Sequence, residues 1–260
     1  MKWIITNNQR KGGVGKSSST LNLACAFAEK GLAVLVIDMD DQQNTTTSIS
    51  AHIDSRLTVA ELLLADEVGV DEAAVKSDWQ NVWIVPSSPN LSGALKHLDG
   101  EVGGHLVLKE KLDRCGRFDI CLIDNSPSLN ILNIGSLCAS THLFIPLSSR
   151  FFSLQGLTQT LSAYNKVKAR LNPDLKLLGM AFVIHDKRNT LANEIVEKVR
   201  DKYPRLVFET IVGTNIRIEE AQVRRQPVLT YAPGDRGSVQ YRSLCAEMLS
   251  RLSDGEADHG

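Results

Sequence analysis

The chain has 260 residues, of which 29 are Lys or Arg and 30 are Asp or Glu, so its formal net charge is −1. A hydrophobic share of 43% and a charged share of 23% exclude a disordered chain, and the length is ample for a core without disulfides or metals. No apolar run approaches the roughly 18 residues of a membrane-spanning helix, and the first residues turn polar too early for a secretory signal. We therefore expect a cytoplasmic protein without a membrane partner.

Short β-branched runs alternate with helical stretches along the chain. The expected strands cover residues 3–7, 33–38, 82–85, 119–124, 142–147 and 177–184. The clearest expected helices cover residues 16–30, 154–171 and 191–203. Continuous apolar strands that alternate with helices predict a doubly wound, mostly parallel sheet with helices on both faces. We predict one such α/β domain over residues 1–252 and a disordered acidic tail over residues 253–260.

Five cysteines are present, and none of them is arranged as CxxC. Cys25, Cys121 and Cys138 lie in apolar stretches, where a free cysteine behaves as a small hydrophobic residue. The spacing favours buried, reduced thiols over a metal or redox site.

The most informative stretch covers residues 10–18, at the turn between the first strand and the first helix. Glycines there let backbone N–H groups converge on phosphate oxygens, and the helix N-terminus adds positive potential. Lys16 is placed to reach the β- and γ-phosphates of a nucleotide, and Ser17 to hold Mg²⁺. The strict phosphate-loop pattern has Gly at the position of Arg10, so this loop is a variant of it. The predicted nucleotide-binding residues of this loop are Lys11, Gly12, Gly13, Val14, Gly15, Lys16, Ser17 and Ser18.

The order Lys-Gly-Gly-Val-Gly-Lys-Ser over residues 11–17 resembles the deviant Walker A motif of ParA/MinD-type ATPases. The resemblance implies a phosphate-loop nucleotidase fold that binds ATP with Mg²⁺ and forms a nucleotide-sandwich homodimer. It also implies that Lys11 is catalytic, reaching across the dimer to the partner's phosphates. Such a contact has the role of an arginine finger, a class worth about 10³–10⁵ in rate.

Two further motifs extend the resemblance. Residues 36–44 resemble the family's second motif, and residues 118–129 its Walker B strand and switch, although Asp41 and Gln43 replace the family's usual Pro and Gly. By this resemblance Asp38 acts near Mg²⁺ and its waters, and Asp40 aligns the attacking water. Asp124 ends a run of four hydrophobic residues, at the sheet edge where a carboxylate can order Mg²⁺. The predicted catalytic residues are therefore Lys11, Asp38 and Asp40, and the predicted metal residues are Ser17, Asp38 and Asp124.

For two aspartates after a strand, a helix N-cap and a turn are the alternative interpretation. Residues 150–157 resemble the family's dimer-face segment, with Arg150 and Gln155 in place of its two acidic residues. Residues 211–221 resemble the loop that lies over the adenine in relatives, which implies nucleotide contacts from Gly213, Thr214 and Asn215. The similarity extends from about Lys2 to Leu252 and is closest in length to the short plasmid-type ParA proteins.

The charge is unevenly distributed. Residues 166–242 hold 15 basic and 9 acidic residues, a net of +6, whereas residues 1–165 have a net of −4. Such a bias is typical either of ordinary solvated helix faces or of a face that binds a polyanion. In relatives nearby arginines bind DNA, and non-specific DNA binding needs side chains that neutralise phosphates. The predicted DNA-binding residues are Lys187, Arg188, Arg217, Arg224, Arg225, Arg236 and Arg242.

The leading hypothesis is a DNA-partition ATPase associated with the nucleoid. Its ATP-bound dimer would bind DNA without sequence preference, and a ParB-like partner would stimulate hydrolysis and release it. A MinD-like or cargo-positioning ATPase is the alternative; a MinD-like membrane cycle requires a basic amphipathic C-terminal helix. Two other classes are weaker: an electron-transfer relative requires paired cysteine ligands, and a small-molecule kinase or synthetase requires a substrate pocket that the motifs do not show.

Overall fold

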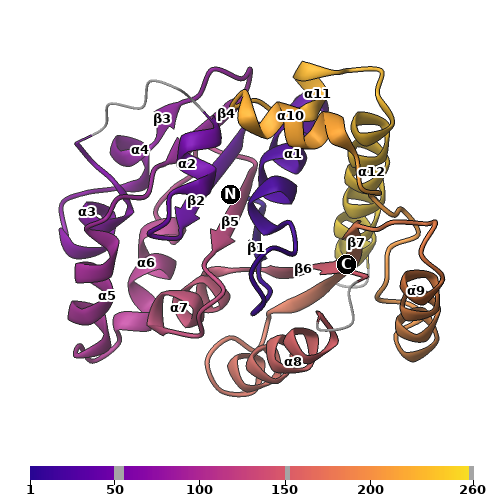
Figure 1. Cartoon of the computed structure of the whole chain (residues 1–260). Helices are drawn as coiled ribbons and strands as arrows, with labels where there is room; N and C mark the ends of the chain where they lie inside the picture. Colours follow the sequence, from indigo (N-terminus) through magenta and orange to yellow (C-terminus); the bar gives the residue numbers. More distant parts are fainter. Residues whose placement is uncertain (50–55, 150–152, 258–260) are drawn as a thin grey trace.

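The computed structural model describes residues 1–49, 56–149 and 153–257, and its centre is a seven-stranded sheet (Figure 1). The strands are β1 (Trp3–Asn7), β2 (Val34–Met39), β3 (Val75–Lys76), β4 (Val82–Val85), β5 (Ile120–Asn125), β6 (His142–Ser148) and β7 (Lys176–Ile184). Their order in the sheet is β3-β4-β2-β5-β1-β6-β7, and every pairing except β3 with β4 is parallel. The predicted doubly wound, mostly parallel sheet is confirmed.

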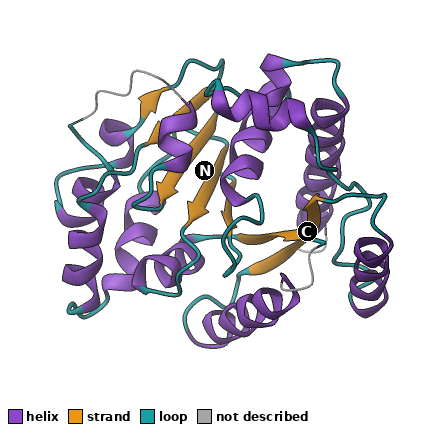
Figure 2. Ribbon diagram, in the orientation of Figure 1, coloured by secondary structure: helices purple, strands orange, loops and turns teal. Residues whose placement is uncertain are grey.

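Helices cover both faces of this sheet (Figure 2). The helices are α1 (Lys16–Glu29), α2 (Asn44–Ile49), α3 (Val59–Leu64), α4 (Val70–Ala73), α5 (Leu91–Asp99), α6 (Val107–Asp113), α7 (Ile131–Ala139), α8 (Ser153–Arg170), α9 (Thr190–Lys202), α10 (Ile216–Val223), α11 (Val228–Tyr231) and α12 (Arg236–Ala257), with a 3₁₀ turn at Gly104–Leu106. Apolar residues of α1 and α12 pack on one face of the sheet, whereas those of α3, α5 and α6 pack on the other. A third cluster joins α8 and α9 to β6 and β7.

The central strands are buried along their whole length, as their uninterrupted apolar sequence predicts. Their parallel register brings the last residues of three strands together, with Asp124 opposite both Asn7 and Asp38. The carboxyl ends of β1, β2 and β5 therefore meet at one edge, which is where open α/β sheets bind ligands.

Two parts of the fold differ from the prediction. The antiparallel strand β3 is only two residues long, and a strand of that length leaves no periodic pattern in the sequence. The predicted disordered tail is wrong for residues 253–257, because α12 continues through Ala257. Extending an existing helix costs less than starting one, so the packed turns before Leu252 propagate into the acidic residues. Residues 258–260 lie outside the described residues.

All five cysteines are free and buried, which confirms the predicted reduced thiols. Burial raises the pKa of Cys25 and of Cys245 to about 12, and that of Cys138 to about 11. Among the residues that the structure describes, no helix has the length and apolar character needed to cross a membrane.

Candidate functional site

The loop between β1 and α1 has a backbone that only glycine adopts easily. Gly13 has a φ of 70° and Gly15, directly before α1, a φ of 82°. A Cβ atom on Gly15 would also lie 3.1 Å from Cγ2 of Val183 in β7. Both the left-handed backbone and the close approach of β7 therefore require glycine at position 15, as the loop motif predicted.

Lys16 is the first residue of α1, directly after this loop, and is only 7% exposed. Its ammonium group donates one long hydrogen bond, 3.5 Å, to the carbonyl oxygen of Lys11. Burial lowers the pKa of Lys16, while the nearby carboxylates of Asp124 and Asp40 oppose that shift. A buried cation with one long hydrogen bond at a helix N-terminus is suited to a phosphate group.

A pocket of about 460 Å³ opens above Lys16. The glycines and serines of the phosphate loop form one wall of it. The other walls come from distant segments of the chain, among them Asp40 after β2, Pro127 after β5 and Gln222 in α10. The carboxyl edge of the sheet and α10 thus enclose the space where the sequence places the phosphates.

Asp40 supplies the acidic group of this pocket. It is 7% exposed, and its Oδ1 accepts a hydrogen bond of 3.1 Å from the backbone N–H of Gln42. Its own N–H donates to Oδ1 of Asp38 at 3.2 Å. These two bonds fix the turn after β2, so that a carboxylate lies among the residues that surround the predicted phosphate position.

Asp38 lies at the end of β2, directly opposite Asp124 in the sheet. It is fully buried, and its Oδ2 accepts hydrogen bonds from the N–H and the hydroxyl of Thr46, at 2.8 and 2.7 Å. Burial, followed by the charge of Asp124, raises the pKa of Asp38 to about 7. Neither Asp38 nor Asp124 is among the residues that line the phosphate pocket, and Asp38 anchors the start of α2 to the end of β2.

Asp124 lies beside Asp38, fully buried at the end of β5. Its Oδ2 accepts a hydrogen bond of 2.6 Å from the hydroxyl of Thr45. Burial raises the pKa of Asp124, whereas the hydroxyls of Ser17 and Thr45 and the charge of Lys16 lower it. The structure therefore brings Asp124 to the hydroxyl of Ser17, and these are two of the three residues that the sequence predicted for the metal.

Thr45 and Thr46 are site residues that sequence reasoning missed. Each hydroxyl donates to one of the two buried aspartates, Thr45 to Asp124 and Thr46 to Asp38. The signal was three consecutive threonines directly after the second motif, in a stretch where a helix N-terminus was an open alternative. Gln222 was also missed, because nothing local in the sequence connects α10 with the phosphate loop.

Lys11 is half-buried on the outer arm of the loop and does not line the pocket of its own chain. A Cβ atom on Gly156 of α8 would lie 3.3 Å from Cβ of Lys11 and 2.8 Å from Oε1 of Gln9. The arm that holds Lys11 therefore packs against the start of α8. Of the predicted dimer-face segment, residues 150–152, Arg150 among them, lie outside the described residues.

The predicted adenine loop forms the start of α10. Asn215 caps this helix, since its Oδ1 accepts from the N–H of Arg217 and its Nδ2 donates 2.6 Å to Asp235. The N–H of Thr214 donates to the carbonyl oxygen of His185 at the end of β7. Gly213, Thr214 and Asn215 do not line the phosphate pocket, which α10 reaches at its other end through Gln222.

Three of the predicted DNA-binding arginines have carboxylate partners within the chain. Arg188 pairs with Asp186 at 2.9 Å, and Arg217 pairs with Glu220 at 2.7 Å. Arg242 makes two hydrogen bonds to Glu29, of 2.7 and 2.8 Å, and so joins α12 to the end of α1. Their positive charge is thus partly compensated where they lie.

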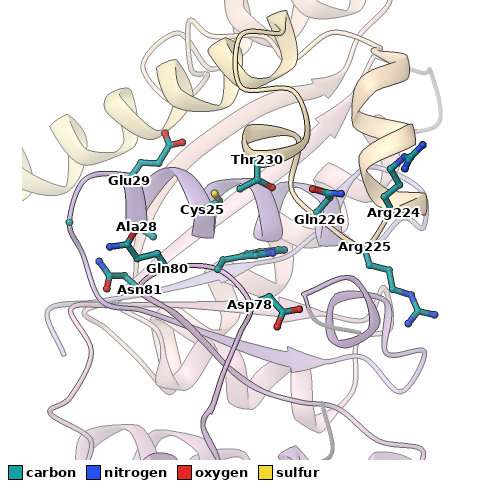
Figure 3. A pocket seen from close by; sticks show the side chains of 12 residues that line it. Cys25, Ala28, Glu29, Asp78, Gln80, Asn81, Arg224, Arg225, Gln226 and Thr230 are labelled. Atoms are coloured by element: carbon teal, nitrogen blue, oxygen red, sulfur yellow. The ribbon is translucent and has the colours of Figure 1, made fainter. Parts of the chain in front are cut away.

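Arg224 and Arg225 line a second pocket, of about 800 Å³, at the far end of α1 from the phosphate loop. Figure 3 shows these two arginines at one end of the pocket and Glu29 at the other. Arg225 has a φ of 55°, so it adopts the left-handed backbone that is rare for a residue with a side chain. The predicted set is completed by Lys187, after β7, and by Arg236, which begins α12 beside Gly213.

The chain is similar to known proteins along most of its length. Residues 1–177 match a family model described as an AAA domain. The chain is 34% identical over 257 residues to the chromosome partitioning protein ParA of Caulobacter vibrioides, covering 98% of this chain and 96% of that protein. It is 31% identical over 249 residues to the sporulation initiation inhibitor protein Soj of Bacillus subtilis, covering 95% and 98%.

A solved structure is also similar along its length. It is that of cobyrinic acid a,c-diamide synthase from Mycobacterium smegmatis with bound ADP and magnesium, and it superposes with a TM-score of 0.84 at 28% identity. The match covers 98% of this chain and 97% of that one.

Proposed function

Because this chain belongs to the ParA/MinD-type ATPase family, we propose that it is a DNA-partition ATPase driven by a cycle of ATP binding and hydrolysis. In the proposed cycle the ATP-bound homodimer binds DNA without sequence preference. A ParB-like partner then stimulates hydrolysis, and the dimer leaves the DNA. The cycle would run in the cytoplasm on the nucleoid.

The observation that carries this proposal is the pocket formed by the phosphate loop, Lys16 and Asp40. Backbone N–H groups and the buried ammonium of Lys16 would bind the β- and γ-phosphates. Asp40 would accept a proton from the attacking water or hold that water in line with the γ-phosphate. Gly213, Thr214 and Asn215 would contact the base from the start of α10.

The residues around Ser17 fit a magnesium ion. Within the described part of the chain no three His, Cys, Asp or Glu side chains are grouped to hold a metal. Mg²⁺ is commonly held by one or two protein oxygens together with substrate phosphates, so a site made only of protein ligands is not required. Ser17 would hold the ion directly, while Asp124 would orient the Ser17 hydroxyl and the bound waters. Bound there, Mg²⁺ would neutralise charge on the phosphates.

Asp38 would act through α2. Its carboxylate holds Thr46, and Thr45 next to it holds Asp124, so α2 connects the two buried acids. We assign Asp38 the role of positioning the metal side of the pocket. Lys11 would act in the partner's site, which is consistent with its absence from the lining of its own pocket.

The test is DNA binding measured with ATP, with ADP and without nucleotide, by fluorescence anisotropy on a labelled duplex. A dimer presents two cationic faces, and joining two weak sites raises the apparent affinity without new contacts. We expect binding only with ATP, at any sequence, and a steep decrease of affinity with salt. Equal binding with ATP and ADP would refute the partition cycle.

A further inference from the structure

A groove of about 970 Å³ lies between the second half of α8, the end of α9 and the start of β7. It is at the amino edge of the sheet, opposite the phosphate loop. Five cationic side chains line it, namely Lys166, Lys168, Arg170, Lys176 and Lys202. None of the described residues that line it is Asp or Glu. We call this feature the α8–α9 groove.

The positive charge in this groove is concentrated by the fold. Lys166 and Arg170 are four residues apart on α8, a spacing at which like charges repel each other. Lys202 approaches from the last turn of α9, and the acidic neighbours in sequence, Asp174 and Asp201, do not line the groove. The C-terminal turns of the two helices favour cations, which offsets part of this repulsion. The remaining excess of positive charge is what an anionic ligand would neutralise.

Two tyrosines hold lysines of the groove in place. The ammonium group of Lys202 lies 5.5 Å from the centre of the Tyr203 ring, and that of Lys168 lies 5.8 Å from the Tyr164 ring. Lys168 also donates 2.8 Å to the carbonyl oxygen of Leu175, so it supports the turn before β7. Lys166, Arg170 and Lys202 are exposed and are the side chains best placed to contact a ligand.

The groove contrasts with three of the arginines predicted to bind DNA. Arg188, Arg217 and Arg242 each share their charge with a carboxylate, which a phosphate group would have to displace. Within the described residues Lys166, Arg170 and Lys202 take part in no ion pair, whereas Arg200 pairs with Glu209. The attraction for a polyanion is therefore expected to be stronger at the groove.

We propose that the α8–α9 groove binds the sugar-phosphate backbone of duplex DNA through Lys166, Arg170 and Lys202. This inference rests on the proposed function, because it assigns a surface to the DNA that the ATP-bound dimer would bind. Four of the five cations are lysines, which contact phosphates as point charges without reading bases. That chemistry fits binding that does not depend on sequence.

The test compares two triple variants that lose the same charge. Lys166→Gln, Arg170→Gln and Lys202→Gln together remove the groove cations. Lys76→Gln, Lys109→Gln and Arg114→Gln remove three exposed cations on β3, on α6 and directly after α6, which do not line the groove. Anisotropy of a labelled duplex of mixed sequence is measured with ATP between about 50 and 200 mM salt. We expect the groove variant to lose about tenfold or more in affinity, and its salt slope to flatten by about one unit per lost phosphate contact.

Two further measurements make the result specific. The charge-conserving variant Lys166→Arg, Arg170→Lys and Lys202→Arg should bind DNA as the parent chain does. Basal ATPase activity should be unchanged in all variants, because the groove is remote from the phosphate pocket, and thermal melting checks that each variant is folded. A loss confined to the groove-to-Gln variant would support the proposal.

Three kinds of outcome would overturn it. No DNA binding by the parent chain with ATP would refute the proposed function and this inference together. Parent-like affinity in the groove variant, or equal weakening in both charge-matched variants, would refute only the groove. The third outcome concerns an acidic polypeptide as the ligand. If poly-L-glutamate binds the parent chain but not the groove variant, while both bind duplex DNA equally, the ligand of the groove is an acidic polypeptide and not DNA.

Discussion

The carboxyl edge of the sheet and the cationic surfaces are built in opposite ways. At the carboxyl edge the charged groups Lys16, Asp38, Asp40 and Asp124 are all buried, and hydrogen bonds to backbone or threonine groups fix the three aspartates. At the cationic surfaces the charged side chains are exposed. A neighbouring carboxylate determines how much of their positive charge remains available to a ligand. The comparison shows that a motif specifies a buried site, whereas exposed charge depends on which residues the fold places beside it.

We expect the largest effect on ATP turnover from Lys11, because this loop lysine would act in the partner's site. Lys11→Ala should retain ATP binding but lose ATP-dependent dimerisation, with turnover reduced by about 10³-fold or more. Lys16→Ala, its counterpart inside the pocket, should instead weaken ATP binding by about 10- to 100-fold. Calorimetry and steady-state ATPase assays on both variants separate the two roles. Turnover at the parent rate in Lys11→Ala would show that the lysine does not act across the dimer.

The next largest effect concerns the acidic group of the pocket. Asp40→Ala should slow hydrolysis by about 10²–10⁴-fold, because the group that aligns the water is removed while Ser17 and the phosphate loop remain. The variant should persist as an ATP-bound dimer in size-exclusion chromatography. A monomer with normal turnover would contradict the role of Asp40.

Burial also predicts how stability depends on pH. The pKa of Asp38 is raised to about 7 in the folded chain by burial and by Asp124, so the unfolded state loses this proton first as pH rises. Without nucleotide or Mg²⁺, the free energy of unfolding should decrease between about pH 4 and 7, by at most about 1.4 kcal/mol per pH unit from this group. Urea denaturation of Asp38→Asn over the same range should show a shallower decrease. Identical pH profiles would mean that Asp38 is charged throughout that range.

The smallest expected effect concerns an exposed ion pair, that of Arg217 with Glu220. Glu220→Gln should free Arg217 from its ion pair and strengthen ATP-dependent DNA binding by about twofold, since exposed pairs are weak. Glu219→Gln changes the net charge equally at an exposed position of the same helix, and it serves as the control. An equal effect of both variants on anisotropy titrations would show that net charge, and not release of Arg217, controls binding.

The sequence predicted the buried part of the molecule well. Continuous apolar runs identified six of the strands, and the glycines with Lys16 and Ser17 located the phosphate loop, because both depend on local backbone geometry. The hydroxyl partners of the buried aspartates were missed, since α2 is short and its threonines give no apolar period. The position of Gln222 depends on the packing of α10 and could not be read locally.

The exposed part was harder to predict for a physical reason. The pair of Arg188 with Asp186 spans two residues and is visible in the sequence, but Arg242 and Glu29 are 213 residues apart. The α8–α9 groove likewise depends on two helices and a strand whose cations are separated along the chain. Counting charges gave the sign of the net charge of residues 166–242, but it did not indicate which cations are neutralised by a neighbouring carboxylate.

The buried thiols have a practical consequence for fluorescent labelling. Maleimide dyes react with exposed thiolates, and burial in this chain raises the pKa of all five cysteines. A cysteine introduced at an exposed position such as Val102 should therefore be labelled alone, with the native cysteines left in place. Two such preparations, one with a donor dye and one with an acceptor, would report subunit association by energy transfer as ATP is added.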